Sequence, residues 1–490
     1  MPETFYGWTG RILHVDLTRE DIAVRSLPLD LTRKFIGQSG INAALLSSMA
    51  VPEMPPLSPE APLIFGVGPL GGTMAPCSGR FTLTFKSPLT GIFADSNCGG
   101  HFGPELKMAG YDHILITGMA QALGFLPTRN FQASTFEGAQ ALCGDELTAH
   151  YLQRHKGCFN CPISCSKYCA VSEGPYAGAQ GEGPEYETLS AFGSKLGNEN
   201  LPAVIQANAL CNQLGLDTIS TGNTIAWVME CCEREVFHLP EEERICFGQH
   251  TQVIDMIKAI VRREGIGHIL AQGAPAASRI LGGEDYVVHS KGLDYPAVDV
   301  RGTKGMALAF AVSPRGGDHL KGLPMFELAP EVYAQDIHNQ FGFSPQGRYW
   351  LEYQTKPELI RWHEDWHCVV DSLGLCKLEG IALKPLLPEH FRDLLHAATG
   401  WDVSVQELRL AGERIWNLER LFNVRLGLGR KDDFPPKRLL QEPISTGPAQ
   451  GETLDVAAFE AMLDAYYKQR GWDRVSGEPL PEKLQELSLL

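Results

Sequence analysis

The sequence predicts an α+β protein in which a β-rich N-terminal part is followed by a mostly helical remainder. In the first hundred or so residues, short segments of alternating apolar and polar residues are separated by turn residues. From about residue 138 onward, apolar residues recur at three- and four-residue spacing. A chain of 490 residues with 44% hydrophobic content can bury a large core, and its length suggests about three domains.

The strand predictions rest on five segments that read as half-buried strands. Each is rich in Val, Ile, Leu, Phe or Thr and is bounded by Gly, Pro or polar residues. The segments are "RILHVDL" (11–17), "IAVRSL" (22–27), "APLIFGVG" (61–68), "RFTLTFK" (80–86) and "HILITG" (113–118). They predict a β-rich base at the N-terminal end of the chain.

Two helices are predicted to end in the same kind of loop. The segments 201–213 and 357–372 have helical periodicity, and Gly215 and Gly374 fall where each helix would stop. Helical periodicity is also sustained over 402–427. The tail from Asp432 is rich in proline, and we expect it to run over the surface rather than join the core.

Charge and composition exclude several classes of protein. The net charge is −16 and no run of Lys or Arg marks a nucleic-acid surface, so nucleic acid is not an expected partner. No apolar run approaches the roughly 20 residues of a spanning helix, and no basic segment precedes an apolar stretch at the start. The sequence therefore predicts a cytoplasmic protein without a membrane span.

The segment "CFNCPISCSKYC" holds four of the 13 cysteines, Cys158, Cys161, Cys165 and Cys169. Three thiolates at such short spacings can bind one [4Fe–4S] cluster and leave one iron for a fourth thiolate. Zinc would need a second ligand pair, which the sequence downstream lacks. An iron-sulfur cluster is thus favoured over zinc and over a chance grouping, while the remaining cysteines are expected to be small buried hydrophobic residues.

Local spacing leaves the fourth cluster ligand open between Cys169 and Cys376. Cys376 ends "DSLGLC" (371–376), which resembles "NQLGLD" (212–217) after the other predicted helix. A loop that occurs twice, with polar anchors in each copy, suits two copies of one ligand. The second copy ends in a thiol, so it can bind the cluster beside one of those ligands.

The chain resembles the aldehyde:ferredoxin oxidoreductase family of tungsten-pterin enzymes. The resemblance runs along nearly the whole chain, in ordered motifs that are far more specific than the cysteine spacing. They include "GRILHVDLT", "GPLGGTMAPCSGRFTLTFKSPLTG", "NCGGHFGPELKMAGYD", "GEGPEYET", "LGLDTISTG", "RGGDHLKG", "DSLGLC" and "GERIWNLERLFN".

The resemblance implies a domain organisation and a set of cofactors. It implies a pterin-binding β domain at 1–122, a helical domain with the cysteine motif at 123–288, and a second helical domain at 289–490. Two pterins would chelate one tungsten or molybdenum, with Mg²⁺ bridging the pterin phosphates. A [4Fe–4S] cluster would pass electrons to ferredoxin or to another iron-sulfur subunit.

The same resemblance implies roles for twelve residues. The cluster ligands would be Cys158, Cys161, Cys165 and Cys376, with Cys169 an extra thiol. The cofactor contacts would be Arg80, Asn97, Asn212, Asp217, Lys321 and Asp371. Glu187 would move a proton and His319 would stabilise the oxyanion of a small aldehyde or acid substrate.

Three departures from the family pattern affect these expectations. After "YDHILITGMAQ" (111–121) the chain omits a long segment that normally completes the pterin-binding domain. Asn212 replaces a usual aspartate, so one pterin contact has an amide acceptor instead of a carboxylate. Gln206 and Ala209 replace a Glu-x-x-His pair that holds a metal between subunits, so any homodimer is expected to form without a bridging metal.

The leading interpretation is a tungsten enzyme that interconverts aldehydes and carboxylic acids. An alternative within the family is the reducing subunit of an aromatic-ring or acid reductase, because the site residues differ little. A different class, favoured by the omitted segment but opposed by the retained site residues, is a non-catalytic [4Fe–4S] electron-transfer protein.

Overall fold

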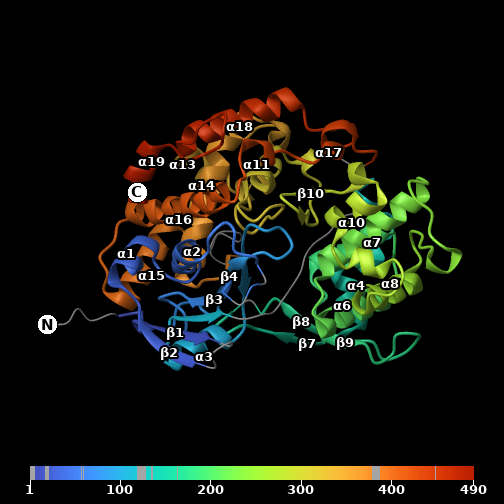
Figure 1. Cartoon of the computed structure of the whole chain (residues 1–490), viewed down its shortest axis with the longest axis horizontal. Coiled ribbons are helices and arrows are strands. Elements are labelled where there is room, and N and C mark those ends of the chain that lie inside the picture. Colours follow the sequence, from blue (N-terminus) through green and yellow to red (C-terminus); the bar gives the residue numbers. More distant parts are fainter. Residues whose placement is uncertain are drawn as a thin grey trace.

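A computed structural model of the chain has three regions that follow one another in sequence (Figure 1). A sheet with short helices lies at the lower left, a helical region at the right, and the C-terminal helices across the top. The structure describes residues 6–16, 21–56, 58, 60–117, 129–133, 136–162, 164–330, 332–377, 387–446 and 449–490.

The N-terminal region is built on a six-stranded sheet with strand order β2-β1-β6-β3-β4-β5. Its strands are β1 (Arg11–Asp16), β2 (Asp21–Ser26), β3 (Pro62–Val67), β4 (Phe81–Lys86), β5 (Phe93–Cys98) and β6 (His113–Thr117). Strands β1 and β6 run parallel, and the other neighbours run antiparallel. The five predicted strands are confirmed, while β5 was not predicted.

Three helices accompany this sheet: α1 (Leu29–Phe35), α2 (Gln38–Met49) and α3 (Phe102–Met108). Helix α2 packs on β3 and β4 and also contacts helices of the C-terminal region. Because it is covered from several sides, its sequence lacks the one-sided apolar pattern of a surface helix. This explains why it escaped prediction.

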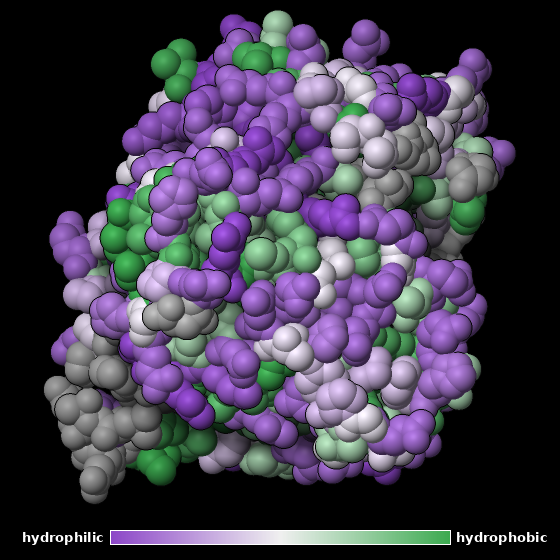
Figure 2. Space-filling view, turned by 90° about the vertical axis from the view of Figure 1, so that its right-hand side faces the viewer, coloured by the Kyte–Doolittle hydropathy of each residue, from purple (hydrophilic) through white to green (hydrophobic). Residues whose placement is uncertain are grey.

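The middle region combines helices with a small sheet of order β7-β8-β9. Its strands are β7 (Leu152–Lys156), β8 (Ser166–Ala170) and β9 (Gln180–Glu182); its helices are α4 (Gly144–His150), α5 (Tyr186–Phe192), α6 (Leu201–Leu214), α7 (Thr218–Glu233), α8 (His250–Arg262), α9 (Gly267–Leu270) and α10 (Ala274–Leu281). These elements share one hydrophobic cluster, from Leu142 to Val287. Their outer face is covered mainly by hydrophilic residues, with hydrophobic ones in separate patches (Figure 2).

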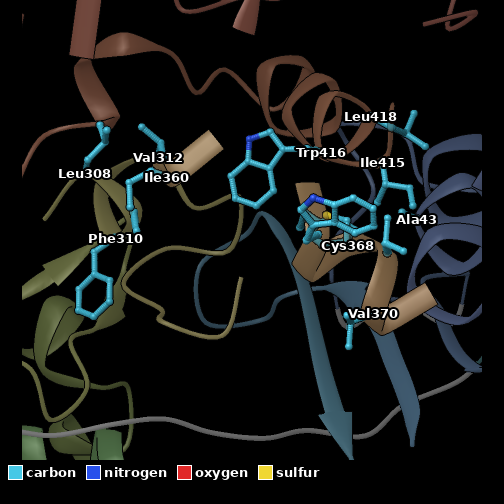
Figure 3. Packing of buried hydrophobic residues seen from close by; sticks show 14 of the residues in the cluster. Ala43, Leu308, Phe310, Val312, Ile360, Cys368, Val370, Ile415, Trp416 and Leu418 are labelled. Atoms are coloured by element: carbon cyan, nitrogen blue, oxygen red, sulfur yellow. The ribbon is translucent and has the colours of Figure 1, made fainter. Parts of the chain in front are cut away.

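The C-terminal region begins with two short strands, β10 (His289–Ser290) and β11 (Leu293–Asp294), and is otherwise helical. Its helices are α11 (Lys304–Val312), α12 (Met325–Leu328), α13 (Ala334–Phe341), α14 (Lys356–Leu373), α15 (Pro388–Thr399), α16 (Val405–Arg425), α17 (Lys437–Gln441), α18 (Val456–Arg470) and α19 (Pro481–Glu486). This region shares one hydrophobic cluster with the N-terminal region. Figure 3 shows Ala43 of α2, Cys368 of α14 and Ile415 of α16 within it.

The expectation that the tail runs over the surface is wrong. Helix α18 contributes fully buried side chains, Phe459, Tyr466 and Tyr467 among them, to the shared cluster. Arg470 at its end lies 2.6 Å from both Glu364 and Asp365 of α14, and all three side chains are buried. The prolines separate the tail from α16, but the apolar face of α18 then returns to the core.

The two predicted loops have matching helix ends. Helix α6 ends at Gly215 and α14 ends at Gly374, and both glycines adopt left-handed backbone conformations, with φ of 68° and 86°. A glycine is favoured there because a side chain would clash in this conformation. The junction at 118–128, where the expected family segment is omitted, lies outside the described residues. Among the described helices, none is long and apolar enough to cross a membrane.

Candidate functional site

The cysteine motif lies in the segment between β7 and β8, and Cys376 follows α14 at the second loop. The pKa of the Cys165 thiol is raised, first by burial and then by negative charge on Cys376, Glu185, Cys161 and Cys158. The four thiols predicted as cluster ligands are therefore within electrostatic reach of one another, although one comes from a segment more than two hundred residues away.

The described residues contain no group of three or more His, Cys, Asp or Glu side chains close enough to hold a single metal ion. A cube of four irons places one ligand at each iron and so needs thiols that stand further apart. A Cβ at Gly99 would come within 2.6 Å of the Cys158 sulfur. The missing side chain at Gly99 keeps this edge of the thiol group open.

Arg80 connects the thiols to a polar group on the sheet. Its Nη2 donates to the Cys376 sulfur at 2.9 Å, and Nη1 donates to Asn97 Oδ1 at 3.5 Å. Asn97 on β5 donates in turn to Asp371 Oδ1 at 3.0 Å. Burial lowers the pKa of Arg80, but Cys376, Cys158 and Asp371 outweigh this effect and raise it. The structure thus brings together four residues that the sequence singled out, from three separate motifs.

Gln38 of α2 and Thr82 of β4 also belong to this polar group, although the sequence did not indicate either of them. Gln38 of α2 and Asn97 both donate to Thr82 Oγ1, at 2.7 and 3.2 Å. Gln38 is fully buried, and its Oε1 has no hydrogen-bond partner among the described residues. An unused buried acceptor beside Asn97 suits a ligand with N–H donors, such as a pterin ring. No sequence signal marks Gln38, which lies in a helix that was not predicted.

Two other cysteines, Cys77 and Cys169, can also be compared with what the sequence led us to expect. Cys77 was expected to be an ordinary buried residue, but its sulfur lies 3.4 Å from the Cys161 sulfur. Its place three residues before Arg80, in the same motif, was the available signal. Cys169 is fully buried in the hydrophobic cluster of the middle region, and burial raises the pKa of its thiol.

Glu187 and His319 come together although they lie in different regions of the fold. Glu187 is in the first turn of α5, and its Oε1 lies 3.7 Å from His319 Nε2. The Ala297 amide donates to Glu187 Oε2 at 2.9 Å. Burial raises the pKa of Glu187, against the lowering effects of His319, the Ala297 amide and Lys195. The side chains stay 17% and 16% exposed, so solvent reaches the pair.

Lys195 is a buried amine near this pair that sequence reasoning missed. Its Nζ donates to Asn223 and to the Tyr295 carbonyl oxygen, the latter at 3.2 Å. Burial lowers the pKa of Lys195 well below its usual value, although Asp294, Glu187 and Asp217 oppose this. An isolated lysine in "FGSKLGN" carries no sequence signal.

Two buried carboxyl groups complete the surroundings of Lys195. Burial raises the pKa of both Asp217 and Asp294 to about 7. Asp217 caps α7 by accepting from the amides of Ile219 and Ser220, and the Ser220 hydroxyl donates to Asp294 at 2.8 Å. The site therefore contains several groups that can exchange protons near neutral pH.

A cavity of about 470 Å³ adjoins the first loop. Its lining includes Gly215, Leu216, Asp217 and Ser220, and its volume is in the range of small-molecule and cofactor sites. Asn212 is not part of this lining; it is exposed on α6 and donates to Asn208 Oδ1 at 3.3 Å. Of the two cofactor contacts predicted in the first loop, Asp217 therefore lines the cavity and Asn212 does not.

Lys321 is held by buried acids. Its Nζ lies 2.8 Å from Glu419 and 3.4 Å from Asp95, and 5.7 Å from the centre of the Phe93 ring. Burial lowers the pKa of Lys321, but Asp95 and Glu419 outweigh this and raise it well above its usual value. Lys321 therefore stays charged, and its charge is compensated within the protein.

The chain is similar to known proteins along its whole length. A sequence profile for "aldehyde ferredoxin oxidoreductase, domains 2 & 3" matches residues 104–489. The tungsten-containing aldehyde ferredoxin oxidoreductases of Pyrococcus furiosus and Thermococcus kodakarensis are 31% and 30% identical, and the alignments cover 99% of this chain and 99% of each relative. The first alignment spans 628 positions against a chain of 490 residues, so the relative carries segments that this chain lacks.

A more distant relative and a solved structure are also similar to this chain. A WOR-like subunit of an aliphatic sulfonate oxidoreductase from Pyrococcus furiosus is 26% identical over 74% of this chain and 55% of that protein. The fold is shared with the active-site complex BamBC of benzoyl coenzyme A reductase in complex with 1,5-dienoyl-CoA, with a TM-score of 0.78, 19% identity and coverage of 99% and 98%. The chain is an oxidoreductase that belongs to the aldehyde ferredoxin oxidoreductase family.

Proposed function

We propose that the protein oxidises aldehydes to carboxylic acids, or runs the reverse reaction, with a tungsten-pterin cofactor, a [4Fe–4S] cluster and ferredoxin as the electron partner. The observation that carries this proposal is the Glu187–His319 pair. These side chains come from motifs more than a hundred residues apart and meet at 3.7 Å, where both stay partly exposed to solvent.

The overall reaction defines what the pair has to do. An aldehyde and water give a carboxylic acid, two electrons and two protons. Glu187, whose pKa is raised by burial, can accept a proton from the attacking water and release it to solvent. His319 can donate a hydrogen bond to the carbonyl oxygen as negative charge develops there.

The cofactors would be held by residues already described. Cys158, Cys161, Cys165 and Cys376 would bind the cluster, and Arg80 would donate to its thiolate ligand. Asn97, Asp371 and Lys321 would hold one pterin with its Mg²⁺, and Asp217, which lines the 470 Å³ cavity, would hold the second pterin. When bound, tungsten or molybdenum would accept the two electrons of the substrate and the cluster would pass them on one at a time.

The test is aldehyde-dependent reduction of methyl viologen by anaerobically purified protein, together with elemental analysis. We expect tungsten or molybdenum, about four irons per chain if one cluster is bound, and turnover with at least one member of a panel of aliphatic and aromatic aldehydes. Iron without tungsten or molybdenum, and without turnover, would contradict the proposal. Full metal content with reduction of aromatic thioesters but no aldehyde turnover would instead indicate a ring-reductase subunit.

A further inference from the structure

The hairpin of β7 and β8 differs in charge from the rest of the chain. We propose that this hairpin, with the apolar side chains beside it, is the docking surface for a small acidic iron-sulfur electron carrier. The proposal rests on the proposed function, because it requires electrons to leave through a cluster held by the segment between the two strands.

The hairpin is basic within an acidic protein. From Leu147 to Ser172 the sequence contains no Asp or Glu but contains Arg154, Lys156 and Lys167, whereas the whole chain has a net charge of −16. Such a chain would repel an acidic partner at most of its surface. A local basic surface allows that partner to approach in one orientation, which speeds association and selects the contact.

The basic side chains are available to a partner. Strand β7 pairs with β8 alone in the described sheet, so it is an edge strand, and its residues from Gln153 to Lys156 are exposed. Arg154 lies 5.4 Å from the centre of the Tyr168 ring and has no acidic partner among the described residues. Lys156 is 2.6 Å from Glu182, but both side chains are about half exposed, so this pair contributes little and can rearrange.

Exposed apolar side chains lie next to the cysteine segment. Met74 is 88% exposed, and its backbone is tied to the segment because Asn160 Nδ2 donates to the Met74 carbonyl oxygen at 3.0 Å. Phe102, 44% exposed, follows His101, whose ring packs edge-on against Phe159 of the segment. Interfaces commonly place apolar residues such as Met and Phe at the centre and charged residues at the rim.

The same surface is where the proposed cluster comes closest to solvent. Cys165 is exposed, whereas Cys158, Cys161 and Cys376 are partly buried. A carrier docked over Met74 and the hairpin would therefore lie beside a cluster ligand. No other part of the protein that the structure describes combines exposed cluster ligands with basic and apolar side chains.

The edge position of β7 offers a second explanation for its basic residues, since Lys and Arg also protect edge strands from pairing with another chain. That role predicts effects on aggregation but none on electron transfer to a protein acceptor. The salt dependence of the reaction and the choice of acceptor therefore distinguish the two explanations.

The test uses Arg154→Glu and Met74→Ser in the metal-loaded protein, with a purified acidic 2[4Fe–4S] ferredoxin and methyl viologen as alternative acceptors. At low ionic strength we expect Arg154→Glu to raise the KM for ferredoxin about tenfold or more. The rate with methyl viologen and the EPR signal of the reduced cluster should stay at wild-type values. For the wild type, the KM for ferredoxin should rise with salt, because salt screens the attraction.

The matched control is Arg474→Glu. Arg474 is 65% exposed and follows α18, which lies at the top of Figure 1 while the hairpin lies at the bottom. This variant makes the same charge change and should leave the KM for ferredoxin unchanged. Arg154→Gln provides a milder version of the test if the reversal impairs folding.

The proposal is overturned if Arg154→Glu and Met74→Ser both bind and reduce ferredoxin as the wild type does. It is also overturned if Arg474→Glu is impaired as much as Arg154→Glu. A stably bound subunit that copurifies at high salt and covers the hairpin would also overturn it. If the wild type lacks aldehyde turnover with viologen, the proposed function fails by itself. Calorimetric titration of ferredoxin into wild type and Arg154→Glu then decides the docking surface separately.

Discussion

Replacing Glu187 by Gln removes the ability of this side chain to carry a proton but keeps the shape of the side chain. The amide can still accept from the Ala297 N–H, which now lies 2.9 Å from Oε2, but it cannot take up a proton. Loss of a positioned acid–base group typically lowers the rate by about 100-fold or more, which corresponds to about 2.7 kcal/mol in the activation free energy. We expect the variant to keep its metals and to lose at least this much of kcat with every aldehyde.

The Glu187→Gln variant should lose activity without losing stability. The folded-state pKa of Glu187 lies above its unfolded value because of burial. Stability linked to this group is therefore present below the unfolded pKa and is lost as pH rises through the folded pKa. Glutamine does not ionise, so the variant should be as stable as the wild type, or more stable, at neutral and higher pH. Any weakened contact with the Ala297 amide should cost only about 1 kcal/mol.

The assay is steady-state turnover with methyl viologen between pH 5 and 9, alongside thermal unfolding at the same pH values. Glu199→Gln is the matched control, since Glu199 is exposed in the same region. A Glu187→Gln variant with wild-type metal content and kcat within a few-fold of wild type refutes the proton-transfer role. A variant that loses activity together with its metals shows a structural role instead.

Three other predictions follow from the geometry. Cys376→Ala should abolish the low-temperature EPR signal of the reduced cluster, whereas Cys169→Ala, in the hydrophobic cluster of the middle region, should keep it; the reverse pattern would exchange their roles. Arg80→Lys keeps a charge but removes the fork that reaches both Cys376 and Asn97, so viologen reduction should slow while the unfolding temperature changes little; unchanged turnover would exclude a role between cluster and pterin. Arg470→Ala should lower the free energy of unfolding by about 3–5 kcal/mol, because it removes the cation that Glu364 and Asp365 share and leaves Asp365 only its ion pair with Arg409; a denaturant titration showing a loss under 1 kcal/mol would contradict this.

The sequence by itself determined the features that neighbouring residues encode. Alternation located five strands, and helical periodicity with a following glycine located α6 and α14 together with the loops at Gly215 and Gly374. The spacing of Cys158, Cys161 and Cys165 likewise indicated a cluster-binding segment. Each of these signals lies within a few residues of the structure it specifies, so it can be read without knowing the rest of the fold.

Elements covered by distant segments could not be found in this way. Strand β5 reads as polar because Asp95 points inward, where Arg315 and Lys321 neutralise it. Helix α2 is buried on several sides, and α18 returns to the core after a proline-rich stretch. Their sequences reflect partners that lie far away along the chain, and those partners are known only once the tertiary structure brings them together.

The chemistry of the site was likewise decided by tertiary structure. The separation of Glu187 from His319, the contact between Cys77 and Cys161, and the lowered pKa of Lys195 all depend on segments from different regions packing together. Burial removes water from these groups, and the resulting shift in pKa depends on every charged neighbour that packs around them. Motifs therefore named most of the candidate residues, but only the packing of distant segments fixed their distances, partners and protonation.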